Sequence, residues 1–119
     1  MALFKKQGFP AAKEVPVSLV GSAGVFGRLD ILAKLPMCIV VCALEMKTGI
    51  DPTFTENQRV YLPLLPLGGH LYSTDLRIQE LGLLPGVPFP PMHVFIVWSV
   101  PLEPGYRVWE ISPKKLNQP

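Results

Sequence analysis

The stretch "MCIVVCALEMKTG", residues 37–49, decides the fold and raises the question of function. Its first part, residues 37–44, is continuously apolar and is typical of a buried strand. Glu45 and Lys47 then place a carboxylate and an ammonium two positions apart, and Gly49 ends the run. Because side chains alternate along a strand, Glu45 and Lys47 point to the same face. The predicted strand therefore carries a charged pair on one face at its end.

Two more strands are predicted before this one. "EVPVSLVGSAG", residues 14–24, alternates valine and leucine with other residues, and "VFGRLDILAKL", residues 25–35, leads to a turn at Pro36. Three strands joined by short turns predict an antiparallel meander. The opening "MALFKKQGFPAAK", residues 1–13, has room for a turn or two of helix, interrupted by glycine and proline.

Helical signals follow the meander. Thr55 and Gln58 form a capping box, so a helix should begin there, and residues 73–82 predict a second capped helix that stops at glycine. Residues 93–100 and 106–112 are rich in β-branched and aromatic residues and predict two strands. The predicted fold class is α/β, with a mixed central β-sheet, an N-terminal antiparallel meander and flanking helices.

The composition predicts a single domain over residues 1–119. Hydrophobic residues make up 49% of the chain and charged residues 17%, which favours a compact globule. The formal net charge is only +2, so any contact with nucleic acid has to be local. No apolar stretch reaches the roughly 18 residues that a membrane span needs, and no export signal is visible, so no membrane association is expected. The sequence does not predict an oligomeric state.

The two cysteines, Cys38 and Cys42, both fall in the predicted strand. Four residues of strand separate their Cα atoms by about 13 Å, which is too far for a disulfide. We therefore expect both to be small buried hydrophobic residues.

A second carboxylate is predicted beside Glu45. If the hairpin turns symmetrically about Pro36 and Met37, Asp30 lies diagonally across from Glu45 and on the same face, roughly 7–8 Å away. Two carboxylates that converge repel each other unless a cation lies between them, and oxygen ligands of this kind suit Mg²⁺, or Mn²⁺ in its place. Lys47 could orient an attacking water or stabilise charge on a phosphate. These are the parts of a phosphodiester hydrolase.

Asp30, the triplet Glu45-Met46-Lys47 and a following helix with Gln58 resemble the core of PD-(D/E)XK nucleases, the restriction-endonuclease-like enzymes. More narrowly, "LEMKTG", "FTENQRVYLPLLPLGG" and "LGLLPGVPFPP" are similar to the nuclease domains at the C-termini of bacterial polymorphic toxins. The resemblance covers roughly residues 27–91.

The resemblance implies a restriction-endonuclease-like fold and a role for each matching residue. Asp30, Glu45 and the main-chain carbonyl of Met46 would ligate Mg²⁺, Lys47 would hold the attacking water, and Gln58 would orient Lys47 or a phosphate. The resemblance also implies a DNA substrate and a cognate immunity protein that blocks the site. The chain would be the toxic domain of a secreted effector that acts in the cytoplasm of a target bacterium.

Other residues have two interpretations each. Arg28 and Arg59 neighbour the predicted site and could contact substrate phosphates, while Trp98 and Trp109 could stack on bases but are more typical of a strand core. The family often supplies a further acid from its first helix, whereas Glu14, the only acid before Asp30, begins a strand here.

The alternative functions are an RNA-cleaving nuclease and a non-catalytic protein-interaction module, in which the charged strand end is a salt bridge.

Overall fold

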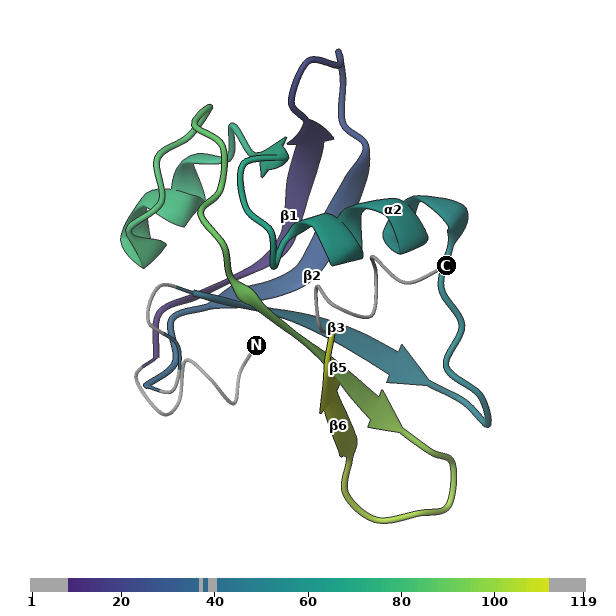
Figure 1. Cartoon of the computed structure of the whole chain (residues 1–119). Coiled ribbons are helices and arrows are strands. Elements are labelled where there is room, and N and C mark those ends of the chain that lie inside the picture. Colours follow the sequence, from purple (N-terminus) through teal and green to yellow (C-terminus); the bar gives the residue numbers. More distant parts are fainter. Residues whose placement is uncertain (1–8, 37, 39–40, 112–119) are drawn as a thin grey trace.

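A six-stranded mixed sheet organises the chain in the computed structural model, which describes residues 9–36, 38 and 41–111 (Figure 1). The strand order is β4-β1-β2-β3-β5-β6, in which β3 and β5 run parallel and the other neighbours run antiparallel. The α/β fold with a mixed sheet and an N-terminal meander is therefore as predicted. The strands are β1 (Ala11–Leu19), β2 (Gly27–Ala33), β3 (Cys42–Thr48), β4 (Leu71–Tyr72), β5 (His93–Ser99) and β6 (Arg107–Glu110).

The register between β2 and β3 differs from the predicted one. Ile31 pairs with Leu44 and Ala33 with Cys42, so the hairpin centre lies one residue later than the symmetrical turn placed it. Moving the centre by one residue shifts the pairing by two, so the paired residues Ile31, Leu32 and Ala33 keep their predicted faces. Continuing the ladder by one pair places Asp30 directly across from Glu45, rather than diagonally.

Strands β1 and β2 bend together at one level. The two strands are paired on both sides of Glu14 and Asp30, but these two residues are not paired with each other, and Glu14 has a positive φ of 54°. Leu29 and Leu32, three positions apart, both reach the same core, which a regular strand does not allow. The bend therefore interrupts the alternation of side chains between the two faces of β2 next to Asp30. The pairing between β2 and β3 ends at the same place.

Helix α2 (Glu56–Leu64) begins where the capping box predicted. The Thr55 side chain accepts the Gln58 backbone N–H, and the Gln58 side chain accepts the Thr55 backbone N–H. Pro63 lies in the last turn of α2, and the helix ends one residue later. The second predicted helix is the short 3₁₀ helix η1 (Leu76–Leu81), which Asp75 caps and Gly82 ends in the left-handed conformation.

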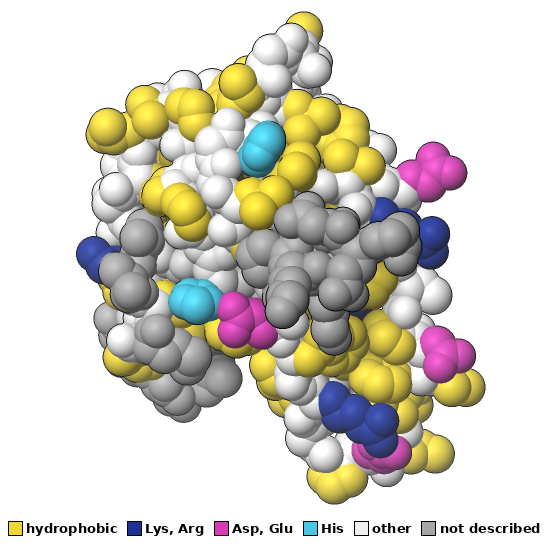
Figure 2. Space-filling view, viewed as in Figure 1, with side chains coloured by type: hydrophobic (Ala, Val, Ile, Leu, Met, Phe, Trp, Pro, Cys, Tyr) yellow, Lys and Arg dark blue, Asp and Glu magenta, His cyan; other side chains and the backbone are white. Residues whose placement is uncertain are grey.

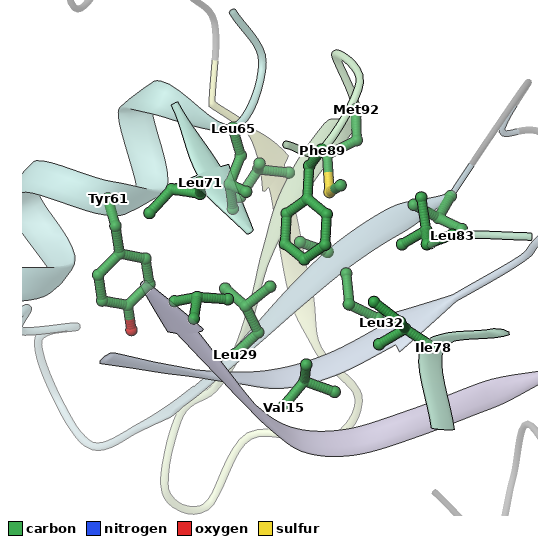
Figure 3. Close-up of a cluster of buried hydrophobic side chains, with 14 of the residues drawn as sticks. Val15, Leu29, Leu32, Tyr61, Leu65, Leu71, Ile78, Leu83, Phe89 and Met92 are labelled. Carbon is green, nitrogen blue, oxygen red and sulfur yellow. The ribbon is translucent and has the colours of Figure 1, made fainter. Parts of the chain in front are cut away.

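Both helices cover one face of the sheet. Tyr61 of α2, Leu65 at the C-cap of that helix and Ile78 of η1 pack on the sheet in one cluster of buried side chains (Figure 3). Phe89, from the proline-rich connection before β5, fills the centre of the same cluster. Burying each of these large apolar side chains contributes about 2 kcal/mol to folding, so the connection is fixed to the core. The opposite face carries a smaller cluster around Ile31 and Leu44.

One expectation was wrong, one falls largely outside the described residues, and one strand was not predicted. Cys38 and Cys42 are paired as a disulfide with Cα atoms 6.1 Å apart, because β3 begins only at Cys42 and Cys38 lies in the preceding loop. Strand β1 begins at Ala11, so the helix expected in the opening segment does not reach that residue, and residues 1–8 lie outside the described part. The sequence did not predict β4.

None of the helices in the described ranges is long and apolar enough to cross a membrane.

Candidate active site at the end of strand β3

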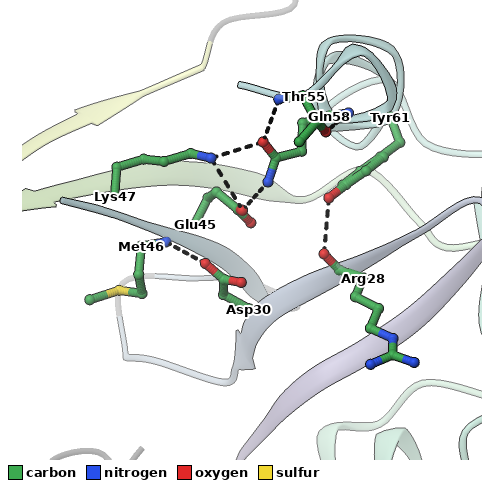
Figure 4. Close-up of polar contacts among 8 residues, drawn as sticks. All are labelled: Arg28, Asp30, Glu45, Met46, Lys47, Thr55, Gln58 and Tyr61. Carbon is green, nitrogen blue, oxygen red and sulfur yellow. Dashed lines mark hydrogen bonds and ion pairs between the residues drawn. The ribbon is translucent and has the colours of Figure 1, made fainter. Parts of the chain in front are cut away.

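The charged pair of β3 lies under the first turn of α2 (Figure 4). Lys47 Nζ is 3.9 Å from Glu45 Oε1, and the side chains are only 14% and 3% exposed. The Lys47 ammonium also lies 4.8 Å from the centre of the Phe54 ring. Phe54, just before the first turn of α2, thus covers the Lys47 side chain. The pair is therefore enclosed and does not resemble a solvated strand end.

Gln58 links the helix to both charged residues. Its Oε1 accepts the Lys47 ammonium at 2.8 Å and the Thr55 backbone N–H at 2.9 Å, while its Nε2 donates to Glu45 Oε1 at 2.5 Å. The opposite orientation of the amide would set its NH₂ group against two other donors, so the neighbours fix the orientation. The capping box thus holds the Gln58 side chain between Lys47 and Glu45.

Asp30 completes the group from the neighbouring strand. Its Oδ2 accepts the Met46 backbone N–H at 2.8 Å, and its carboxylate lies beside that of Glu45 (Figure 4). This position follows from the bend. The pairing of β2 with β3 covers Ile31 to Ala33 and does not include Asp30, so the Asp30 side chain can reach the backbone of β3. The structure therefore brings together Asp30, Glu45 and Lys47 and adds Gln58 from α2.

Glu45 is a buried carboxyl group with a raised pKa. Burial, followed by the negative charge of Asp30, raises the pKa of Glu45 from its ordinary value of 4.5 to about 7, although the Lys47 charge lowers it in part. Its Oε2 is buried and accepts no hydrogen bond from the described residues. Buried carboxylate oxygens in folded proteins nearly always have a partner, so this one requires an explanation.

The unpartnered oxygen fits a bound cation. A divalent ion would satisfy Glu45 Oε2 and offset the repulsion between Glu45 and Asp30. The Met46 N–H faces Asp30, and since the N–H and C=O of a strand residue point to the same neighbouring strand, the Met46 carbonyl faces this side too. Within residues 9–36, 38 and 41–111, no group of three or more His, Cys, Asp and Glu side chains is arranged to hold a metal. Two carboxylates and a carbonyl suit Mg²⁺, which keeps several of its waters.

A hollow of about 260 Å³ opens beside Asp30. Glu14 and Met46 line it together with Asp30, as do Lys13 and Ile31. Glu14, which was predicted only as the start of a strand, thus lies near Asp30 in the bent strand β1. Of the site residues, only Asp30 and Met46 line this hollow, so it reaches the site from the side of Asp30.

The predicted phosphate contacts are less well supported. The Arg28 side chain extends away from Glu45 and Lys47, and its carbonyl accepts the Tyr61 hydroxyl at 2.9 Å (Figure 4). Arg59 is exposed on α2, one residue after Gln58. Of the two arginines, Arg59 is thus the one whose side chain remains a candidate for substrate contact.

No protein-family model, curated protein or solved structure matches the chain. The functional argument therefore depends on the geometry of the site.

Proposed function

We propose that the chain is a metal-dependent nuclease that hydrolyses phosphodiester bonds, with DNA as its substrate. The observation that carries the proposal is the convergence of Asp30, Glu45, Lys47 and Gln58 from two strands and a helix, around a buried carboxylate oxygen that has no hydrogen-bond partner among the described residues. A salt bridge that only stabilised the fold would not require a second carboxylate or leave an oxygen unsatisfied.

Asp30, Glu45 and the Met46 carbonyl would hold Mg²⁺ or Mn²⁺. When bound, such an ion polarises a phosphate oxygen, acidifies a water and neutralises charge that develops during hydrolysis. The residues themselves provide the remaining parts of the site. Lys47 presents a positive charge for an attacking water or a phosphate oxygen, and Gln58 fixes the Lys47 ammonium. Arg59 would contact a phosphate farther along the substrate.

The restriction-endonuclease-like fold and the biological role are parts of the same proposal. They are supported by the motif resemblance and by a mixed sheet in which the β3 site lies next to a parallel strand. On this proposal the domain is the toxic end of a bacterial effector that acts inside a target bacterium, and an immunity protein would block its site.

The test is cleavage of a supercoiled plasmid by the purified protein with Mg²⁺ and with a chelator. Glu45→Gln and Lys47→Met should each lower the rate by at least about 100-fold, as expected when an electrostatic group of an active site is removed. Thr74→Ala, an exposed substitution far from the site, serves as the matched control and should cleave like the wild type. Folding of each variant is verified by circular dichroism. If the folded wild type leaves DNA and RNA intact with several divalent metals, the proposal is wrong.

The second candidate function is a non-catalytic interaction module. One observation favours it: all four residues of β6, at the edge of the sheet, are exposed. Sheet edges of this kind can pair with an added strand. The module has no use for a bound divalent ion at Glu45, so metal binding at that residue would argue against it.

A further inference from the structure

Both tryptophans of the chain lie on the same side of the sheet as the candidate site. Trp98 of β5 pairs with Lys47 of β3 in the parallel ladder, and Arg107 of β6 pairs with Trp98 on its other side. Paired residues in neighbouring strands point to the same face. Trp109 pairs with Ile96, whose other partner is Glu45, so Trp109 also shares this face.

The three side chains form one surface, which we call the aromatic platform: Trp98, Arg107 and Trp109. The Arg107 guanidinium lies 5.1 Å from the centre of the Trp98 ring. The two tryptophan rings meet edge to face, with their centres 6.2 Å apart. Trp98 is anchored because its indole N–H donates to the Gly49 carbonyl at 2.8 Å, at the turn that follows Lys47. The platform is thus joined directly to the strand end that carries the site.

The platform is open to solvent, unlike an aromatic core. Trp109 is 36% exposed and Arg107 is exposed, because β6 is the edge strand. Figure 2 shows basic, acidic and hydrophobic side chains gathered over the β5–β6 hairpin. Arg107 is held by Glu103 at 3.0 Å, and both partners are about half exposed. An exposed ion pair of this kind contributes at most about 1 kcal/mol, so Arg107 is free to exchange Glu103 for a phosphate.

We propose that the aromatic platform stacks the bases of unpaired nucleotides next to the scissile phosphate, so that the substrate is single-stranded or locally unpaired nucleic acid. This inference rests on the proposed nuclease function. Indole rings stack on any base, and a guanidinium can stack on a base or bind a phosphate, so the platform needs no particular sequence. In a duplex, the faces of the bases are already stacked on each other and are not available to Trp109.

The spacing agrees with this assignment. Trp109 is two strands away from Glu45, or about 10 Å at the usual distance between neighbouring strands. A stacked single strand advances roughly 3.4 Å per nucleotide, so about three nucleotides span that distance. A base on Trp109 would therefore belong to a nucleotide close to a phosphate at Lys47.

The test is binding of a short thymidine oligomer and of an oligomer of equal length that lacks all bases, both in a chelator so that no cleavage occurs. Fluorescence anisotropy of the labelled oligomers gives the dissociation constants. Because both tryptophans belong to the platform, intrinsic fluorescence reports directly on its contacts. We expect the thymidine oligomer to quench the tryptophan fluorescence and to bind at least about 10-fold more tightly than the baseless oligomer.

Variants of β6 show whether stacking is the cause. Trp109→Ala should weaken binding of the thymidine oligomer roughly 5- to 100-fold and leave the baseless oligomer unchanged. Trp109→Phe, which keeps an aromatic face, should recover most of the affinity. Val108→Ala is the matched control, because Val108 is 58% exposed on the opposite face of the same strand. Equal affinity for the two oligomers, or no effect of Trp109→Ala, would overturn the inference.

The two proposals fail in different ways. If the thymidine oligomer binds through Trp109 but no divalent metal supports cleavage, the nuclease function is wrong and the platform remains a binding surface for unpaired bases. If cleavage requires Glu45 and Lys47 but Trp109→Ala binds and cleaves like the wild type, the platform is wrong and the nuclease function stands.

Discussion

Replacing Glu45 by glutamine should make the protein more stable at alkaline pH and no more stable at acidic pH. Burial and Asp30 raise the pKa of Glu45 to about 7, against an ordinary value of 4.5. Between these two pH values the folded state holds a proton that the unfolded state has released. The stability that this proton supplies is therefore fully present below pH 4.5 and is lost as the pH rises through 7.

The size of the effect follows from the same two values. Each pH unit between 4.5 and about 7 corresponds to about 1.4 kcal/mol, so ionising Glu45 costs the folded state about 3 kcal/mol in total. Glutamine has the shape of the protonated carboxyl group and carries no charge. Glu45→Gln should thus match the wild type near pH 4 and exceed its free energy of unfolding by about 3 kcal/mol near pH 8.

Urea denaturation followed by circular dichroism, at several pH values and with a chelator, measures this difference directly. Other titrating groups are common to both proteins and cancel in the comparison. A difference that stays constant from pH 4 to pH 8 would refute the argument, because it would mean that Glu45 ionises with an ordinary pKa in the folded state.

Adding Mg²⁺ extends the same experiment to the metal site without depending on activity. A cation that binds only the folded state stabilises it by about 1.4 kcal/mol at ten times its dissociation constant. The wild type should gain this stability at pH 8, whereas Glu45→Gln should gain none. Equal gains in both proteins would show that Glu45 does not hold the ion.

Three further predictions follow from the site and its supports. Lys47→Gln should raise the pKa of Glu45 and Asp30→Asn should lower it, since each removes a charge that acts on this carboxyl group; carbon NMR of the carboxylates during a pH titration measures both. Thr55→Ala removes the helix cap and should cost about 1 kcal/mol in urea denaturation, with slower plasmid cleavage as the capped glutamine loses its position. Gly27→Ala should cost about 1–3 kcal/mol, because its new Cβ would collide with the ring of a buried tyrosine of α2; a thermal melt that matches the wild type would contradict this.

The strands and the capped helix could be predicted because their signals are local. Alternating apolar residues located β1, a continuous apolar run located β3, and the capping box located the first residue of α2. The register of the β2–β3 hairpin could not be predicted, because it depends on the eight residues between Ala33 and Cys42 rather than on the strands. The error changed the position of Asp30 along β3 but not its face, and the candidate site was still found.

Features that depend on tertiary structure were missed. The disulfide between Cys38 and Cys42 was excluded because the predicted strand began at residue 37, five residues before β3. For Trp98 and Trp109 the core was favoured over base stacking because strand aromatics usually pack there, and no local pattern shows that β6 is an edge strand that leaves Trp109 exposed. Gln58 had two interpretations, as a cap and as a site residue, and the structure shows that its single amide makes both sets of contacts.

The charged end of β3 lowers the free energy of unfolding, and the contacts among the described residues do not offset this loss in full. An ordinary salt-bridged strand end is exposed, keeps its carboxylate solvated and has little effect on stability. Glu45 is instead buried next to Asp30, with one oxygen unpartnered among the described residues, at a cost of about 3 kcal/mol near pH 8. An apolar residue of similar size would remove this cost. A residue that weakens the fold where an apolar one would strengthen it is best explained by a ligand that offsets the charge, and a divalent cation supplies what Glu45 and Asp30 lack.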